Sequence, residues 1–412
     1  MARSKPGRLY RKLQPEQPLF RLTIEDGTDL RDTTLTGVTI KRGDGSPGGG
    51  VSPSTLEVGL SGFASIRSGL HCSLSLTTYG AQLLNGSVGA TASLIQPRFS
   101  GRIGRQHVDD RGRRQQTTLL AASWTAQLAR VRKTYTPTIG ENVATVVSEL
   151  MTSPALPRLS APTRMATPDQ YGTVHKVEDP QTYGDISKWT SDLGLTVRET
   201  RAGGQQILTH AQRWADALDR MDRSIPVIRA QALAPAKWQQ DSEGIPRNQH
   251  LTWGAGAGTN SATWGDLSDP YAVTVDHDLT HARFNNEDQV RAEGFRLRAL
   301  EWESAYAIPN VEIDLIQLIT SAKKYDRDQA ARLLTMNIGD PIYLSGDWHN
   351  NLQGIHFITE VTETITGNGW SLSLSLAPAQ IVVGSVSPTV PARVWDSATY
   401  PWSDESRTWN AA

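Results

Sequence analysis

The chain has 412 residues, more than one compact core usually contains, so we expect roughly two to four modules. Its 41 Lys and Arg residues nearly balance 42 Asp and Glu residues, which excludes an overall field that would hold nucleic acid or an anionic membrane. No apolar run approaches the roughly 18 residues of a membrane helix, so no membrane-spanning segment is expected.

The single cysteine, Cys72, excludes an intrachain disulfide and a C-x-x-C redox pair. It lies in an alternating run, which indicates a buried small side chain rather than a nucleophile. The basic N-terminus is not followed by the apolar stretch of a secretory signal, so classical export is not expected. A reducing site of assembly fits both observations.

Residues 1–135 are predicted to form an N-terminal β-rich module. Gly and Asp turns separate short runs in which apolar and polar residues alternate, a pattern typical of strands. These runs are Leu19–Glu25, Thr34–Arg42, Ser54–Leu60, Leu70–Thr77, Ala90–Ile95, Phe99–Ile103 and Thr117–Val131. Gly43, Gly45 and Gly48 have the spacing of a dinucleotide-binding loop, but Pro53 soon follows and excludes the helix that such a loop must open, so we interpret them as a flexible loop.

Residues 136–212 are predicted to form a small α+β domain. Val143, Val146 and Leu150 have helical spacing, and the next apolar stretch repeats the pattern. The expected elements are helices over 141–151 and 180–193, followed by a hairpin with strands over 195–198 and 206–210.

The rest of the chain is divided into three predicted regions. Residues 213–306 combine an irregular β region with a long helix, residues 307–380 a C-terminal β-barrel-like module, and residues 381–412 an extended Trp-rich tail. The expected elements are strands over 227–232 and 271–275 separated by the Gly- and Trp-rich stretch 251–265, a helix over 286–306, a strand over 311–319, a polar helix over 325–334 and three closing strands. The fold class is therefore α+β and predominantly β, with two barrel-like or sandwich-like modules flanking smaller α+β domains.

No motif in the sequence predicts a catalytic, cofactor or metal site. A phosphate-binding P-loop and a nucleophile elbow do not occur in it. The best metal candidate is the run Asp276, His277, Asp278 with His281, because the two histidines would share one face of a helix. Spacing alone is a weak signal, and we interpret this run as a solvated loop.

A basic cluster over residues 98–133 contains nine Lys and Arg residues against two Asp residues. One interpretation is a solvated hairpin tip, and the other is a contact with an acidic partner or with passing DNA, since attraction to phosphate needs no base-reading motif. The candidate contact residues are Arg98, Arg102, Arg105, Arg111, Arg113 and Arg114.

The C-terminal tail contains aromatic residues in an otherwise polar segment, at Trp395, Tyr400, Trp402 and Trp409. Pro401 argues against a long helix, and tryptophan is enriched at interfaces, so we expect an extended segment that docks on a neighbouring subunit or another protein. Folding back on its own domain and sugar binding are the alternatives.

Three stretches together resemble minor tail proteins of the baseplate hub class, from long-tailed siphoviruses of actinobacteria. They are LTGVTIKRGDG with STLEVGL, then NIGDPIYL with GIHFITEVTETITGNGWSLSLSLAPA, and the ending VWDSATYPW. The second is the most specific, because Ile338, Gly339 and Asp340 match the turn, and 370–378 match the last strand, of that pattern. Such hubs are similar to the tail hub of T-even phages.

The resemblance implies a structural, non-enzymatic virion protein at the distal end of the tail, assembled in the host cytoplasm without a cofactor. It implies a homotrimeric ring that connects a sixfold tail tube to a threefold tip and encloses the channel for the tape measure protein and DNA. The implied partners are distal tail or tail tube proteins, other minor tail proteins, the tape measure protein and transiently passing DNA, bound without sequence specificity. The alternatives are a tail-associated cell-wall hydrolase and a carbohydrate-binding adhesin that uses Trp253, Trp264 or the tail tryptophans.

Overall fold

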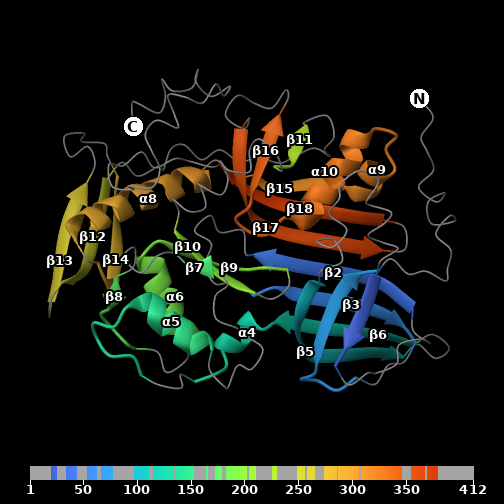
Figure 1. The fold of residues 1–412 in the computed structure, drawn as a ribbon, viewed down its shortest axis with the longest axis horizontal. Coiled ribbons are helices and arrows are strands. Elements are labelled where there is room, and N and C mark those ends of the chain that lie inside the picture. Colours follow the sequence, from blue (N-terminus) through green and yellow to red (C-terminus); the bar gives the residue numbers. More distant parts are fainter. Residues whose placement is uncertain are drawn as a thin grey trace.

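We describe the fold from a computed structural model of the chain. The described residues are 20–25, 34–43, 53–62, 66–77, 97–110, 115–132, 136–152, 164–165, 172–178, 182–201, 204–209, 225–229, 248–255, 258–264, 273–284, 286–305, 308–345, 354–366 and 369–378. Strands dominate them and arrange into three sheets, which confirms a predominantly β fold (Figure 1).

The N-terminal half of the largest sheet follows the alternation seen in the sequence. Its strands are β1 (Phe20–Ile24), β2 (Thr34–Gly43), β3 (Thr55–Ser61), β4 (His71–Leu76), β5 (Pro97–Asp110) and β6 (Gln115–Ser123). Cys72, Leu74 and Leu76 of β4 are buried while the residues between them are partly exposed, because successive side chains of a strand point to opposite faces. The buried position of Cys72 confirms its interpretation as a small apolar side chain, and burial raises its pKa to about 12.

The C-terminal half of the sheet contains the closing strands and two helices. Its elements are β11 (Val227–Arg229), β15 (Ile308–Asp314), α9 (Leu315–Ile319), α10 (Lys324–Thr335), β16 (Pro341–Ser345), β17 (Gly354–Thr366) and β18 (Gly369–Pro378). The prediction of a single strand over 311–319 was wrong beyond Asp314. The Asp314 carboxylate accepts the backbone N–H groups of Ile316 and Gln317 at 2.9 and 3.2 Å, which caps α9 and ends the strand.

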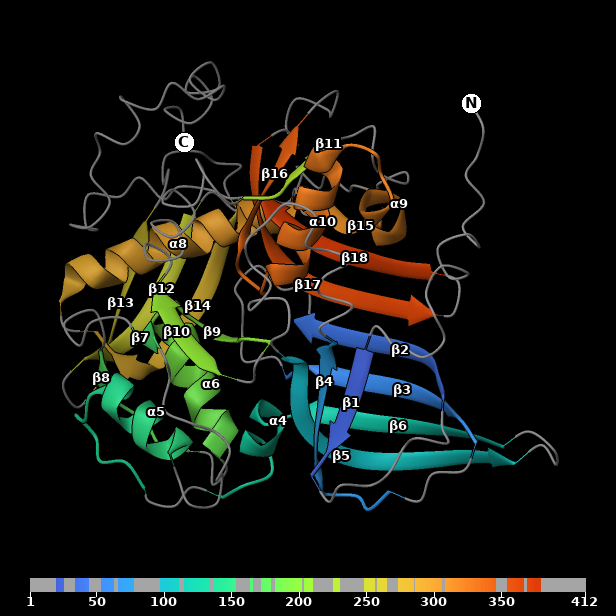
Figure 2. The same ribbon diagram turned by 45° about the vertical axis from the view of Figure 1, so that its right-hand side comes forward.

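The two halves join edge to edge into one curled sheet, because β2 pairs antiparallel with β17. We call this β2–β17 pairing the seam, and both views of the fold show the two strands side by side (Figures 1 and 2). One apolar core extends through both halves, and Phe20 of β1 packs edge-on against Trp370 of β18 with ring centroids 5.1 Å apart. The boundaries near residues 135 and 307 stay a prediction, but the shared sheet is a feature that the sequence did not indicate.

A separate α+β unit lies beside the seam and has its own apolar core. It contains α4 (Thr125–Leu128), α5 (Val143–Met151), α6 (Thr182–Asp192) and the strands β7 (Arg164–Met165), β9 (Leu195–Glu199) and β10 (Gln205–Thr209). The two helices and the hairpin confirm the predicted elements. The expected strand over 117–131 ends earlier, at Ser123, because α4 begins two residues later and contributes Leu128 to the core of the α+β unit.

A four-stranded sheet forms the last unit, and the helix α8 (Glu287–Ala305) lies across it (Figure 1). Its strands are β8 (Thr173–Val174), β12 (Asn248–Ala255), β13 (Gly258–Trp264) and β14 (Thr274–Arg283). The long helix confirms its prediction, whereas the Gly- and Trp-rich stretch is a hairpin and not an irregular separator. A Cβ on Gly254 would lie 2.7 Å from the ring of His175, so this glycine permits close packing and does not end a strand. Among the described residues, no helix is long and apolar enough to cross a membrane.

Candidate functional site: a buried polar junction at the seam

The basic cluster does not form one surface patch. Arg98 is 2% exposed and donates to the Glu363 carboxylate, with its Nε 2.9 Å from Oε1 and an Nη 2.6 Å from Oε2. Its prediction as a channel or partner contact was wrong in this fold, because its guanidinium is already committed to a buried carboxylate. Arg102 and Arg105 are exposed on β5, and Arg102 donates to the Gly69 carbonyl at 2.9 Å.

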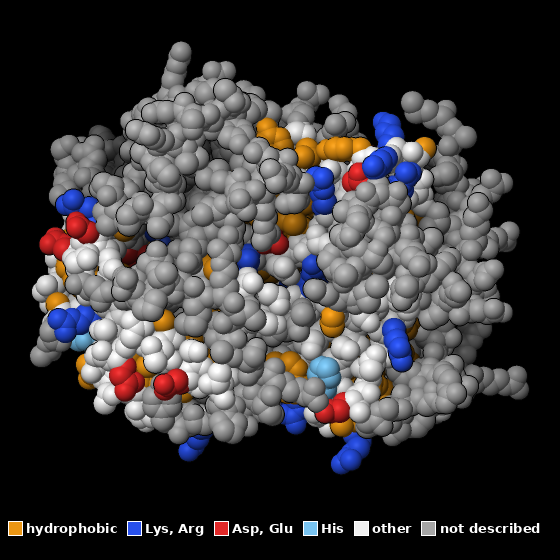
Figure 3. Space-filling model, in the orientation of Figure 1, with side chains coloured by type: hydrophobic (Ala, Val, Ile, Leu, Met, Phe, Trp, Pro, Cys, Tyr) orange, Lys and Arg blue, Asp and Glu red, His pale blue; other side chains and the backbone are white. Residues whose placement is uncertain are grey.

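The other candidate residues lie outside the described part of the chain. They are Arg111, Arg113, Arg114, Trp395, Tyr400, Trp402 and Trp409. Figure 3 shows one face of the molecule, where the Lys and Arg side chains of described residues are scattered among polar atoms.

Glu363 is the centre of the buried charge at the seam. It lies on β17 at 0% exposure and accepts the Trp370 indole N–H at 3.0 Å in addition to Arg98. Arg42, from the partner strand β2, lies 3.9 Å away and donates to the Arg98 carbonyl at 2.5 Å. Burial alone would raise the pKa of Glu363, but the charges of Arg98 and Arg42 and the hydrogen bonds from Arg98 and Trp370 hold it below its usual value. The carboxylate is therefore ionised, and its single negative charge faces two buried cations.

The hairpin β9–β10 reaches from the α+β unit to the end of the seam, as both views show (Figures 1 and 2). The Arg198 guanidinium forms a buried ion pair with Asp340 at 3.0 Å and also donates to the Ile338 carbonyl. Arg201 donates to the carbonyls of Leu334 and Thr335, at the C-terminal end of α10. Cations at this end of a helix are favoured because its last carbonyls have no partners within the helix. These contacts attach the hairpin to the C-terminal half of the sheet.

The same hairpin contacts the N-terminal half through Glu199. The Glu199 carboxylate accepts the backbone N–H of Ser54, the residue before β3, at 3.3 Å. The Gln205 amide instead donates to the Thr125 hydroxyl of α4, within the α+β unit, at 2.6 Å. Burial raises the pKa of Glu199 to about 7, although hydrogen bonds from Ser123 and Ser54 partly oppose the shift. The Oε1 atom of Glu199 has no hydrogen-bond partner among the described residues.

Sequence reasoning missed this junction, although a signal was present. Arg42 follows Val38 and Ile40 in the buried phase of β2, and Glu363 stands between Val361 and Ile365 in the buried phase of β17. A charged residue in the buried phase of an otherwise apolar alternation indicates a paired internal charge.

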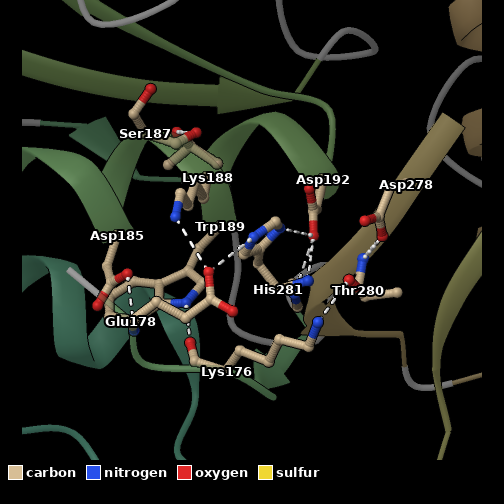
Figure 4. A network of polar contacts seen from close by, with 12 residues as sticks. Lys176, Glu178, Asp185, Ser187, Lys188, Trp189, Asp192, Asp278, Thr280 and His281 are labelled. Atoms are coloured by element: carbon tan, nitrogen blue, oxygen red, sulfur yellow. Dashed lines mark hydrogen bonds and ion pairs between the residues drawn. The ribbon is translucent and has the colours of Figure 1, made fainter. Parts of the chain in front are cut away.

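A second polar network joins α6 to β14 (Figure 4). The two ring nitrogens of His281 lie 3.5 Å from carboxylate oxygens of Asp192 and Glu178. Asp192 also accepts the backbone N–H groups of His281 and Ala282 at 2.7 and 3.0 Å. The Asp192 carboxylate beside the ring raises the pKa of His281, because its negative charge favours the protonated ring. We call this network the His281 joint.

The candidate metal run does not assemble into a site. It is part of the strand β14, so His277 and His281 do not share a helical face, and the expectation of a loop was also wrong. His277 faces the Gln249 amide at 2.5 Å, while His281 is in its own joint with Asp192. Within the described residues, no group of three or more His, Cys, Asp or Glu side chains is placed to hold a metal ion.

Comparison with known proteins identifies the fold. No protein-family model matches the sequence, and no curated protein matches it. A tail protein from Neisseria meningitidis superposes with a TM-score of 0.61 at 10% identity over 87% of this chain and 96% of that one. A 43 kDa tail protein of prophage MuSo2 from Shewanella oneidensis gives 0.58 at 9% identity over 88% and 98%. A prophage tail protein from Listeria monocytogenes gives 0.51 at 8% identity over 89% and 96%.

The chain therefore has a phage-tail-type fold, and the likeness extends over most of its length. This confirms the coarser part of the resemblance. The hub class and the actinobacterial siphovirus origin stay predictions, because identities near 10% define the fold alone.

Proposed function

We propose that the protein is a structural component of a phage tail tip. In this proposal it forms a homotrimeric baseplate hub ring that connects the sixfold tail tube to the threefold tip and encloses the channel for the tape measure protein and DNA. The supporting observation is the phage-tail-type fold, which matches solved tail proteins over nearly their whole length. Closed rings of identical subunits need two different, complementary surfaces on each chain. The large sheet and the smaller units attached to it offer separate outer surfaces for these two contacts.

The proposed mechanism is mechanical. The buried charges of the seam keep the two halves of the large sheet in one fixed arrangement, so that three copies can form a continuous wall. Distal tail or tail tube proteins and other minor tail proteins would contact the outside of the ring. Passing DNA would meet the wall only through its phosphates, without sequence-specific binding. We further propose that the tail tryptophans, at Trp395, Trp402 and Trp409, dock on a neighbouring subunit or another tail protein.

The first experiment is the mass of the full-length protein in solution by light scattering, followed by imaging of single particles. A particle of three times the 45.1 kDa chain mass with an axial opening is the expected result. A protein that stays monomeric both alone and on isolated tails would contradict the ring. Release of soluble fragments from host cell walls would instead favour a hydrolase, and binding to a glycan column would favour an adhesin.

A charge reversal tests the role of the basic tip. Replacing Arg111, Arg113 and Arg114 by Glu in the phage should reduce particle yield or DNA delivery, because the reversed charges repel an acidic partner or phosphates. The matched control is the same reversal at Arg130 and Arg132, which belong to the basic cluster but lie beyond β6. Unchanged yield and infectivity of the triple variant would leave the solvated hairpin tip as the correct interpretation.

A further inference from the structure

The hairpin β9–β10 touches both halves of the large sheet because its two faces carry different polar pairs. Glu199 and Gln205 are opposite each other in the hairpin, and so are Arg198 and Gln206. Successive side chains of a strand point to opposite faces, so the two pairs face in opposite directions. Glu199 of the first pair meets Ser54 of the N-terminal half, and Arg198 meets Asp340 of the C-terminal half.

This attachment is polar, unlike the interior of the units that it joins. The large sheet and the α+β unit have separate apolar cores. Ion pairs and hydrogen bonds cross from the hairpin to the sheet, through Arg198 to Asp340, Arg201 to Leu334 and Glu199 to Ser54. Interfaces of this polar kind between units of one chain typically permit relative motion.

Two buried atoms in the attachment lack partners. Within the described part of the chain, Glu199 Oε1 and Arg201 Nε make no hydrogen bond. A buried polar atom without a partner destabilises the state that buries it, since water would satisfy the atom on exposure. The docked state therefore carries a cost that undocking relieves.

We propose that the hairpin is a releasable clasp, which docks the α+β unit on the seam and lets it undock while the large sheet stays folded. The apolar core within each unit is kept on release. The polar contacts of the hairpin are exchanged for water, together with the Arg102–Gln127 hydrogen bond and the stacking of His71 on Trp124 beside α4. The His281 joint holds α6 to β14, so the four-stranded sheet is tied to the α+β unit from the other side. The clasp is a property of the isolated chain, so it holds or fails independently of the tail-hub proposal.

The test is hydrogen exchange of the full-length protein, measured by mass spectrometry on peptides from each unit. The double variant Arg198→Met with Asp340→Asn removes the ion pair without leaving a lone buried charge. We expect exchange in α5, α6 and the hairpin to rise about tenfold, with β17 and β18 unchanged, which corresponds to the loss of one favourable contact of about 1.4 kcal/mol. The matched control is Lys41→Met with Glu360→Gln, which removes an exposed ion pair across the seam.

A second variant is expected to strengthen the docking of the hairpin on the large sheet. Glu199→Gln keeps the shape of the side chain and removes a buried charge, so at pH 8 it should slow exchange in α5 and α6 relative to the parent. The Arg42 guanidinium is the charged neighbour of Glu199, and it keeps Glu363 as its partner in this variant. Faster exchange throughout the large sheet in the double variant would show one cooperative unit and overturn the clasp. Unchanged exchange in both variants would also overturn it.

Discussion

Two ion-pair networks join separate parts of this chain, and they differ in their access to water. At the seam, Arg98 and Glu363 are 2% and 0% exposed. At the His281 joint, the histidine is 19% exposed and Glu178 is 47% exposed. The first network balances charges that cannot reach solvent, so removing one partner is costly at any pH. The second exchanges protons with water, so its strength follows pH.

The largest effect is expected from a variant that breaks the buried ion-pair network at the seam. Glu363→Gln leaves Arg98 and Arg42 without their counter-charge, and we expect the free energy of unfolding to fall by about 3–5 kcal/mol. Urea unfolding followed by tryptophan fluorescence measures it, with Trp370, which donates to Glu363, among the twelve tryptophans that report. Glu360→Gln on the same strand is the control. A loss as small as that of the control would mean that Glu363 is not the counter-charge.

The next largest effect concerns Glu199, whose pKa is shifted by burial and not by an ion pair. The pKa of this carboxyl is raised from 4.5 to about 7, so the folded state keeps a proton that the unfolded state releases. Stability therefore falls as pH rises through this window and is lowest above pH 7. Glu199→Gln should remove the slope and stabilise the protein at pH 8 by an amount on the order of 3 kcal/mol. Parallel pH profiles for the variant and the parent would contradict a buried proton at Glu199.

A smaller effect is expected at the His281 joint, the more exposed of the two networks. The pKa of His281 is raised above 6.5 by Asp192, so its stabilisation is complete below pH 6.5 and is lost as pH rises through the folded pKa. His281→Asn should lower the free energy of unfolding at pH 5.5 by less than about 1 kcal/mol and leave it nearly unchanged at pH 8.5, because solvent screens the pair. His107→Asn, at an exposed position of β5, is the control. Equal losses at both pH values would indicate packing instead of charge.

The smallest effect concerns the exposed pair on the seam itself. Lys41 and Glu360 are 3.1 Å apart, with the lysine 51% exposed. Lys41→Ala should change the unfolding free energy by no more than about 0.5 kcal/mol, and the change should disappear in 1 M salt. A loss comparable to that of Glu363→Gln would mean that exposure does not set the strength of these pairs.

The sequence by itself determined most of the local structure. Alternation in runs such as 71–76 defined strands, and helical spacing over 141–151 defined α5, whose cap at Asn142 accepts the N–H of Ala144 at 2.9 Å. Both patterns are properties of neighbouring residues, which is why they can be recognised without the fold. The predictions failed where a distant contact decided the outcome, as at Gly254, which packs against His175.

Only the tertiary structure decided that Arg98 is inside. Arg98 belongs to a basic run, and the sequence cannot distinguish it from the exposed Arg102 or Arg105. Its burial follows from the pairing of β2 with β17, which brings Glu363 to it from the other end of the chain. Strand pairing depends on the match of two remote edges and on the core that they share, and neither is encoded in the local pattern.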